Sequence, residues 1–214
     1  MINIPLFIEC FPQLLNACKL TFLIAFFSTL IGMIGGTLIA LGQRSKLKII
    51  TYPLATYVAI IRGTPMIVQI VFWYYGLQMP LDPLIVAIIA IGFNSAAYIS
   101  QVMATGIKAV EKGQLEAAQV MGFSKLAQMR YIVLPQALRV VLPSLGNEFV
   151  TMIKDSSLAY IIGVNELFKE SRNLISTTYD VMTIYIAITL LYFTMTHTLT
   201  LIIQNIEKRL DKPC

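Results

Sequence analysis

Residues 115–135 read LEAAQVMGFSKLAQMRYIVLP. This segment decides the fold because it is a polar, patterned island between long apolar stretches. The 214-residue chain is 57% hydrophobic and only 13% charged, with a mean hydropathy of +0.75. A soluble protein carries about 25% charged residues. Apolar runs of about 20 residues predict membrane-spanning helices, because a helix satisfies its own backbone groups in lipid.

Five spans can be placed along the chain. They cover residues 20–41, 53–77, 84–107, 138–153 and 181–203, and the fourth is weaker and more polar than the rest. Their apolar runs are continuous rather than alternating, which favours helices over barrel strands. The sequence therefore predicts an all-α membrane protein with a single domain, residues 1–214, and a polar loop over residues 108–137. In the first span, Gly32 and Gly36 form a small-xxx-small pair that permits close helix approach.

The distribution of Lys and Arg predicts the orientation in the membrane. Those on one side of the five spans are Arg44, Lys46, Lys48, Lys108, Lys112, Lys125, Arg130, Arg139, Lys208, Arg209 and Lys212. Those on the other side are Lys19, Lys154, Lys169 and Arg172. Cytoplasmic loops carry the excess of positive charge. The N-terminus is therefore expected outside, and the island and the C-terminus in the cytoplasm.

The composition excludes several classes of function. The net charge of +5 does not indicate nucleic-acid binding, because the basic residues are spread among loops. The three cysteines lack metal-ligand spacing, and no metal site is expected. His197, the single histidine, is expected to hydrogen-bond a neighbouring helix. No nucleophile or metal constellation for catalysis is visible, so the chain is not expected to be an enzyme.

Arg62 lies inside the second apolar region, where a charge is costly. If that span begins at Pro53, Arg62 is about 13 Å along the helix and should face protein or water. Alternatively, residues 51–61 lie partly in the interface and the span proper begins near Thr64-Pro65. Proline is well tolerated in the first turn of a helix, so residues 62–65 would then be a break.

The island is predicted to form two short helices joined by an elbow. Residues 116–121 form the first helix, and Gly122 is its left-handed stop. Ser124 is the expected N-cap of the second helix, over residues 125–134, and Pro135 is expected to end it. A hairpin resting on the membrane surface is the simplest alternative interpretation.

The island resembles the cytoplasmic loop signature of the permease subunits of binding-protein-dependent ABC importers. The pattern Glu-Ala-Ala-x3-Gly-x9-Ile-x-Leu-Pro is matched at Glu116, Ala117, Ala118, Gly122, Ile132, Leu134 and Pro135. Further segments resemble the polar amino acid branch of that family: residues 62–65 (RGTP), 68–69 (VQ), 112–114 (KGQ), 134–137 (LPQA), 146–149 (GNEF) and 154–158 (KDSSL). The resemblance extends from about Thr21 to Leu210 and implies the type I importer permease fold.

The resemblance also implies a set of partners. In that family the loop forms coupling helices that dock into a cleft of a cytoplasmic ATPase. The chain itself has no Gly-x4-Gly-Lys-Ser/Thr, so it lacks a phosphate cradle and no cofactor is expected on it. ATP and Mg²⁺ belong to a dimer of the partner ATPase. A second permease subunit, identical or homologous, an external amino-acid-binding protein and membrane lipids complete the expected assembly in a bacterial inner membrane.

Two departures from the pattern of that family stand out, one at residues 100–104 and one at Ser156. Residues 100–104 read SQVMA where the branch commonly has Ala-Glu-Ile-x-Arg, so a carboxylate and a guanidinium are both missing at Gln101 and Ala104. The joint absence of the two charges is what we expect if they form an ion pair in the family and this chain has lost it. Ser156 replaces a more usual threonine and keeps the hydroxyl.

Polar residues in the third and fourth spans are the candidates for the transport path, because polar groups avoid lipid. Asn94, Tyr98 and Gln101 share one helix face. The others are Asn147, Glu148, Thr151, Lys154, Asp155 and Ser156. A free amino acid carries an ammonium, which Glu148 or Asp155 can meet, and a carboxylate, which Lys154 can meet. Alternatively, Lys154 and Asp155 mark the outer water boundary and Glu148 pairs with a neighbouring helix.

The sequence therefore predicts a permease subunit of an ATP-driven importer for a polar amino acid. Glutamine is the first expectation for the solute. A cationic amino acid such as arginine is the alternative, because Glu148 and Asp155 are acidic. An ATP-independent channel or a membrane enzyme would need a self-contained gate or a catalytic constellation, and neither is visible.

Overall fold

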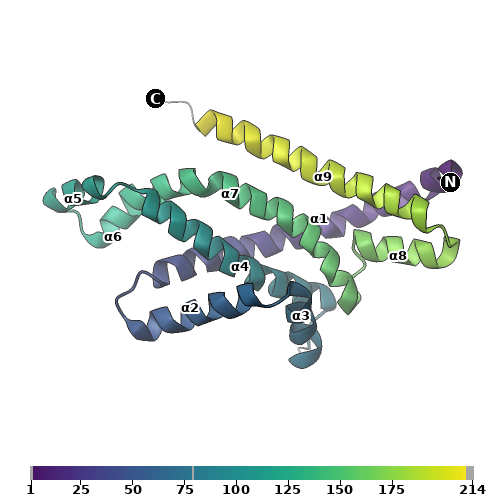
Figure 1. Ribbon diagram of the computed structural model, residues 1–214, viewed down its shortest axis with the longest axis horizontal. Coiled ribbons are helices and arrows are strands. Elements are labelled where there is room, and N and C mark those ends of the chain that lie inside the picture. Colours follow the sequence, from purple (N-terminus) through teal and green to yellow (C-terminus); the bar gives the residue numbers. More distant parts are fainter. Residues whose placement is uncertain (1, 79, 211–214) are drawn as a thin grey trace.

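The computed structural model describes residues 2–78 and 80–210. It is built from helices, in the order α1 (Ile4–Gly42), α2 (Lys48–Gly63), α3 (Met66–Val71), α4 (Pro83–Ala109), α5 (Lys112–Val120), α6 (Lys125–Gln128), α7 (Leu134–Asp155), α8 (Leu167–Thr178) and α9 (Val181–Leu210). π-helical turns follow α3 (Phe72–Gly76) and α6 (Met129–Val133), and a 3₁₀ turn follows α7 (Ser156–Ile162). Figure 1 shows the long helices lying side by side.

The long helices α1 and α4 form the centre of the bundle. Gly32 and Gly36 of α1 face α4, where a Cβ on Gly32 would meet Ser95 Oγ at 2.5 Å and one on Gly36 would meet Ile99 Cγ2 at 2.7 Å. The predicted close approach at this glycine pair is confirmed. Gly106 of α4 lies equally close to α7, since its Cβ would be 3.0 Å from the carbonyl oxygen of Ala137. Glycines therefore set the distances between the three central helices.

Among the described residues, three helices are long and apolar enough to cross a membrane: α1, α4 and α9. The α2 helix and the segment Met66–Gly76 pass the same test together but are bent by 110° at the break between them. The break predicted as the alternative at residues 62–65 is therefore confirmed, and residues 53–77 do not form one straight helix. That residues 53–77 form one membrane span stays a prediction. The residue before Pro65 is extended, as proline requires, with Thr64 at φ −119° and ψ 144°.

The predicted fourth span lies within α7, which has 22 residues. That length suffices for a membrane span of about 20 residues. This helix is less apolar than the other predicted spans, because polar residues such as Asn147, Thr151 and Lys154 line one of its faces. The total of five spans therefore stays a prediction. The first helix is longer than the predicted span 20–41 and begins at Ile4, capped by the Asn3 side chain.

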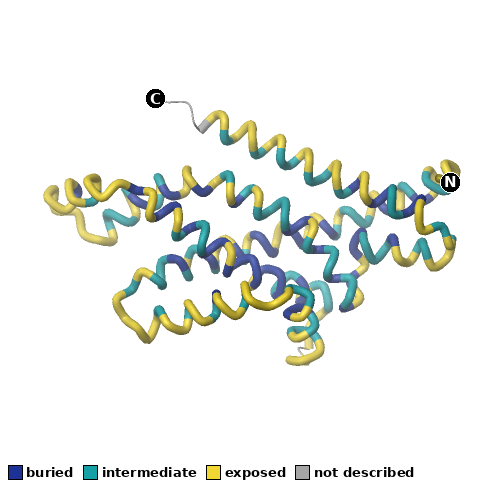
Figure 2. Tube along the Cα trace, viewed as in Figure 1, coloured by how far each residue is buried: buried dark blue, intermediate teal, exposed yellow. Residues whose placement is uncertain are grey.

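The ends of the helices agree with the predicted charge asymmetry. In Figure 1, the C-terminal ends of α1 and α9 lie toward the same end of the bundle as α5 and α6, and α8 lies toward the other end. Of the Lys and Arg residues assigned to the cytoplasm, Lys112 belongs to α5, Lys125 to α6, and Lys208 and Arg209 to the end of α9, whereas Lys169 and Arg172 belong to α8. Lys212, assigned to the same side, lies outside the described residues. Figure 2 shows that burial is concentrated where α1, α4 and α7 meet, and that α5 and α6 are largely exposed.

At the α8 end, the fully buried carboxylate of Glu166 joins α8 to α9. It accepts hydrogen bonds from the backbone N–H groups of Phe168 and Lys169, at 2.8 Å each, and so caps α8. It also accepts a 3.1 Å hydrogen bond from the hydroxyl of Tyr192 on α9. On α1, the hydroxyl of Thr21 accepts the backbone N–H of Leu167. The beginning of α8 is thereby fixed to α1 and α9.

Burial raises the pKa of Glu166 from 4.5 to about 7, although the three hydrogen bonds act in the opposite direction. Between these two values the folded chain keeps a proton that the unfolded chain releases. We therefore expect stability to fall by roughly 3 kcal/mol as the pH rises from 4.5 to about 7, and to level off above that. Thermal unfolding of the detergent-solubilised chain at pH 5 and pH 8 measures this change. Glu166→Gln should reduce the difference, whereas the exposed Glu9→Gln should not; equal slopes in both variants would contradict the assignment.

Candidate functional site

The polar island forms a compact elbow at one end of the bundle. Gly122 has a φ of +82°, in the left-handed region, and ends the turn after α5. The side chain of Ser124 accepts the backbone N–H of Ala127 and caps α6. The predicted elbow, its glycine stop and its N-cap are therefore confirmed. The first helix begins at Lys112, earlier than the predicted residue 116.

The prediction that Pro135 ends the second helix is wrong. The chain continues through a π-helical turn, Met129–Val133, directly into α7. In this wide turn the backbone N–H of Leu134 bonds to the carbonyl of Met129. Pro135 then occupies the first turn of α7, where its missing N–H is tolerated. The elbow is therefore connected to the predicted path helix without an intervening loop.

A pair of glutamines ties the two arms of the elbow together. The side-chain amide of Gln136 donates to Gln114 Oε1 at 2.6 Å and to the carbonyl of Ile132 at 3.1 Å. Gln114 lies on α5 and Gln136 on α7. This hydrogen bond links α5 to the beginning of α7. Sequence reasoning noted both residues only as parts of short motifs.

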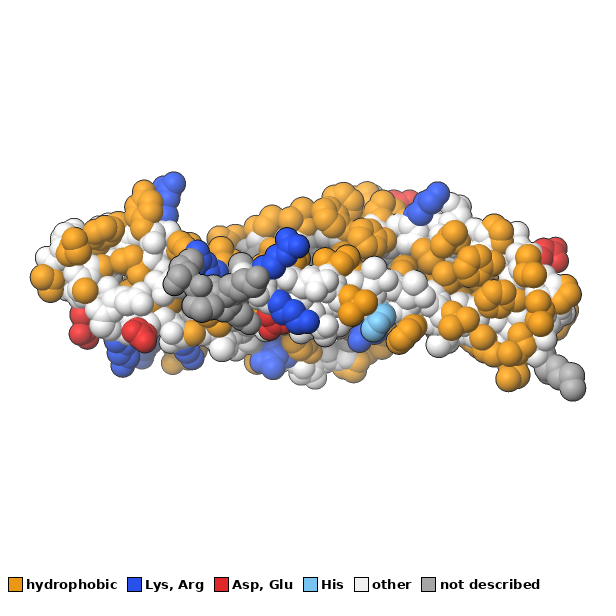
Figure 3. Space-filling model, turned by 90° about the horizontal axis from the view of Figure 1, so that it is seen from above, with side chains coloured by type: hydrophobic (Ala, Val, Ile, Leu, Met, Phe, Trp, Pro, Cys, Tyr) orange, Lys and Arg blue, Asp and Glu red, His pale blue; other side chains and the backbone are white. Residues whose placement is uncertain are grey.

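The outer surface of the elbow is apolar although it is fully accessible. Val120 is 89% exposed, Met121 78% and Leu126 79%. Apolar side chains this exposed at the tip of a protein mark an interaction surface. At this end of the molecule, Figure 3 shows hydrophobic side chains beside charged ones. A polar rim around apolar residues is typical of a protein interface.

The signature residues take different places on this elbow. Glu116, Ala117, Gly122 and Pro135 are exposed, Ala118 is buried, and Ile132 and Leu134 are half-buried. Glu116 is in the middle of α5 rather than at its start, so it does not cap its own helix. Its carboxylate is accordingly accessible to a partner.

The predicted path residues of α7 are on two faces of the helix. Asn147 and Lys154 are exposed, and Thr151 is half-buried with its hydroxyl bonded to the carbonyl of Asn147. Glu148 is half-buried and accepts a 3.2 Å hydrogen bond from Ser95 Oγ of α4. This contact is the pairing with a neighbouring helix that the sequence offered as the alternative role of Glu148.

Asp155 and Ser156 mark the end of α7. Asp155 is half-buried, and Ser156 is fully buried with its hydroxyl bonded to the carbonyl of Ile153 at 2.8 Å. The hydroxyl of Ser156 is therefore satisfied inside its own helix. Among the residues at this end, Lys154 and Asp155 offer the accessible charges.

Asn94, Tyr98 and Gln101, predicted to share one face of α4, have different surroundings in the structure. Asn94 is buried and donates to Gln69 Oε1 at 3.0 Å, whereas Tyr98 is exposed beneath the guanidinium of Arg62, 5.4 Å from the ring centre. Gln101 is half-buried and lines a polar cavity of about 490 Å³ between α1, α2 and α4, together with Arg62. The guanidinium of Arg62 and the side-chain amide of Gln101 thus line the same cavity.

Gln69 is the main residue whose role sequence reasoning missed, because it was noted only as part of the short motif at residues 68–69. Its side-chain amide donates to the carbonyl of Ile61 at 2.8 Å, and to the carbonyl and hydroxyl of Thr64 at 3.1 and 2.9 Å. Its oxygen accepts from Asn94. These bonds satisfy the backbone groups that the break between α2 and α3 leaves free. A glutamine shortly after an Arg-Gly-Thr-Pro break is a signal that could have identified it.

Because Gln69 supplies these bonds, Gln69→Leu should destabilise the fold by about 1–3 kcal/mol, since it leaves the buried amide of Asn94 without a partner. The exposed Gln119→Leu is the matched control and should change stability little. Thermal unfolding in detergent measures both. Equal unfolding temperatures for the two variants would show that the network does not hold the break.

Comparison with known proteins identifies the family. The profile of the family described as "binding-protein-dependent transport system inner membrane component" matches residues 20–212. The chain belongs to this family. The probable amino-acid ABC transporter permease protein YckA of Bacillus subtilis is 36% identical over 97% of this chain and 92% of its own length. The glutamine transport system permease protein GlnP of Escherichia coli K12 is 32% identical over 93% of each chain.

A solved structure supports the assignment of the chain to this family. The structure of an amino acid ABC transporter with histidines is 33% identical and has a TM-score of 0.91, covering 98% of this chain and 99% of that chain. The predicted all-α permease fold is confirmed by this match. The site residues are not tested by it, and their roles remain predictions.

Proposed function

We propose that the chain is the permease subunit of an ATP-driven amino acid importer in a bacterial inner membrane. The elbow formed by α5 and α6 carries this proposal. It offers an exposed apolar tip, the accessible carboxylate of Glu116 and a direct helical connection to α7. A cytoplasmic ATPase dimer would hold the elbows of two permease subunits, and its closure on ATP would move α7 in each.

The remaining partners follow from the same assignment. The chain lacks a phosphate-binding loop, so ATP and Mg²⁺ would be bound by the ATPase subunits. A second permease subunit, identical or homologous, would complete the pore. A binding protein outside would deliver the solute near α8, at the end opposite the elbow. The N-terminus would be outside and the C-terminus in the cytoplasm, as the clustering of Lys and Arg favours.

For the solute we propose a polar amino acid, with glutamine first and a cationic amino acid such as arginine second. The relative GlnP is described as a glutamine permease, which supports the first choice. Glu148 and Asp155 support the second, because carboxylates attract a cationic side chain. The hydroxyl of Ser95 bonds to Glu148 Oε1, and Glu148 is half-buried rather than fully buried, which supports a contact of its carboxylate with a solute.

The test is ATP-dependent uptake into vesicles that contain the chain, its ATPase and its binding protein, with glutamine and arginine as competing solutes. Glu148→Gln should lower arginine uptake by about tenfold or more, because loss of a charge-assisted hydrogen bond removes about 1.5–3 kcal/mol. Glutamine uptake should change less. The exposed Glu9→Gln serves as the control, and unchanged uptake and selectivity in Glu148→Gln would remove this residue from the path.

A further inference from the structure

A polar cavity of about 490 Å³ lies between α1, α2 and α4, and the guanidinium of Arg62 is the charged group in its lining. We call this space the Arg62 cavity. The other side chains that line it are neutral: Gln43, Thr51, Ala55, Val58, Ala59 and Gln101. Its volume is within the range of about 300–1,000 Å³ that is usual for ligand sites. A cavity lined by a cation and by no anion attracts an anionic group.

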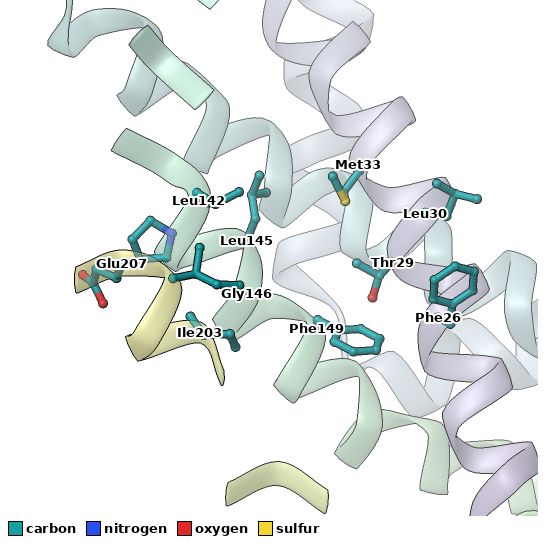
Figure 4. Close-up of a pocket in the computed structure, with 12 residues that line it drawn as sticks. Phe26, Thr29, Leu30, Met33, Leu142, Leu145, Gly146, Phe149, Ile203 and Glu207 are labelled. Atoms are coloured by element: carbon teal, nitrogen blue, oxygen red, sulfur yellow. The ribbon is translucent and has the colours of Figure 1, made fainter. Parts of the chain in front are cut away.

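Two other cavities carry charge of the opposite sign. An apolar groove of about 310 Å³ lies over α7, between α1 and α9, and the carboxylate of Glu207 is the charged group in its lining. Figure 4 shows Glu207 at one end of this groove and Phe26 at the other. A third cavity, of about 390 Å³ between α1 and α8, is lined by Glu9 and Glu170. Neither space offers a cation to a carboxylate, whereas the Arg62 cavity does.

Arg62 lies at a depth where membrane lipids offer no anionic partner. Its guanidinium is 5.4 Å from the centre of the Tyr98 ring. Tyr98 is about 22 Å along α4 from its beginning at Pro83 and about 16 Å from its end at Ala109. The hydrocarbon core of a membrane is about 30 Å thick, and the lipid phosphates lie outside it. A cation in the middle of a membrane-spanning bundle faces protein or water and marks a functional site.

The charge of Arg62 is unmatched inside the chain. Within the described residues, no carboxylate forms an ion pair with Arg62, and its exposed guanidinium lies over Tyr98. Lys154, the cation that the sequence offered to a solute carboxylate, has different surroundings. It lies at the end of α7 next to Asp155, and the two charges are close enough to interact. Arg62 is therefore the cation that has most to gain from a carboxylate of the solute.

The Arg62 cavity is within one turn of α4 from the residue that we propose contacts the solute. Ser95 of α4 donates a hydrogen bond to Glu148, and Tyr98, beneath Arg62, is three residues further along the same helix. Three residues rise by about 4.5 Å and are neighbours on the helix surface. A carboxylate and a guanidinium thus contact α4 within one turn, which suits a solute that carries both charges.

Gln101 supplies a second donor to the Arg62 cavity. Its side-chain amide donates to Ser100 Oγ at 3.3 Å, and an amide nitrogen carries two N–H groups. One N–H is therefore left for a ligand in the cavity that Gln101 lines. Arg62 itself offers its N–H groups in a planar fork that matches the two oxygens of a carboxylate.

We propose that Arg62 binds the α-carboxylate of the transported amino acid, with the amide of Gln101 as a second donor. This inference rests on the proposed function, because it takes the solute to be an amino acid. It assigns to Arg62 the role that the sequence offered to Lys154. Every amino acid carries this carboxylate, so Arg62 would recognise the class of solute, and contacts elsewhere in the path would select the solute side chain.

The test measures binding of glutamine and of arginine to the complex of the permease with its ATPase in lipid nanodiscs, without the binding protein, by calorimetry. Each amino acid is compared with its α-amide, in which a neutral carboxamide of similar shape replaces the carboxylate. The wild type should bind the amino acid about tenfold to a hundredfold more tightly than the α-amide, as expected for a charge-assisted hydrogen bond. Arg62→Gln should lose this preference with little change in α-amide binding, whereas Arg62→Lys keeps a cation and should retain most of it.

Lys154→Gln is the matched control and should keep the preference for the amino acid over its α-amide. A merely structural role of Arg62 would weaken the binding of both ligands by the same factor, so an unchanged preference in Arg62→Gln would overturn the proposal. Loss of the preference in Lys154→Gln would assign the carboxylate to Lys154 instead. A wild type that binds neither amino acid would contradict the proposed solutes and this inference together. A wild type that binds an amino acid no better than its α-amide would contradict this inference alone.

Discussion

Replacement of Gly122 by valine should strongly reduce ATP-dependent uptake while the chain still folds and enters the membrane. Gly122 has a φ of +82°, and a left-handed conformation costs a β-branched residue about 1–2 kcal/mol or more. No neighbouring atom lies within 4 Å of an added Cβ, so the cost comes from the backbone alone. The elbow would relieve this strain by changing the angle between α5 and α6. An ATPase cleft that fits the elbow would then bind it at least about tenfold more weakly.

Gly113→Val is the matched control for this prediction. Gly113 is on α5, nothing lies within 4 Å of its Cβ, and its φ is not in the positive range. Uptake, membrane content and thermal unfolding should be measured for both variants. Wild-type uptake in Gly122→Val would mean that the shape of the elbow does not matter to coupling. Glu116→Lys, which reverses an exposed charge on the same helix, tests the partner contact independently of the backbone.

The sequence predicts the elbow well because its signals are local. Gly122 and Ser124 act on their immediate backbone neighbours, and each allows few conformations. The proline at 135 was misinterpreted for a similar reason. A proline within a helical pattern can end the helix or occupy the first turn of the next one, and only the π-helical turn before it distinguishes these outcomes.

The polar path was less predictable because it depends on contacts between distant segments. Spacing places Asn94 and Tyr98 on one face of α4. In the structure, however, Asn94 donates a hydrogen bond to Gln69, whereas the ring of Tyr98 lies beneath Arg62. The break between α2 and α3 brings these partners into place, and no periodicity within α4 reports it. Likewise, Ser95 orients Glu148 across 53 residues of sequence, a pairing that only helix packing creates.

The second large effect is expected at Gly36, where α1 and α4 are closest. A Cβ there would lie 2.7 Å from Ile99 Cγ2, 2.8 Å from Ile99 Cβ and 2.9 Å from the carbonyl oxygen of Ala96. The first of these atoms could rotate away, but the last belongs to the backbone of α4. Even Gly36→Ala must therefore push the two helices apart, and overpacking of this kind costs about 1–3 kcal/mol.

Gly63→Ala is the control, because nothing lies within 4 Å of its added Cβ and it is likewise in a helix. Alanine favours the helix by up to about 1 kcal/mol at either position, so the difference between the variants isolates the helix contact. We expect Gly36→Ala to unfold about 2–12 °C below Gly63→Ala in detergent, from a cost of about 1–3 kcal/mol on the scale of about 2–4 °C per kcal/mol. Identical unfolding temperatures would show that α1 can move away from α4 at little cost. In that case the pair formed by Gly32 and Gly36 would provide flexibility rather than a fixed contact, and α1 would be free to move relative to α4 during transport.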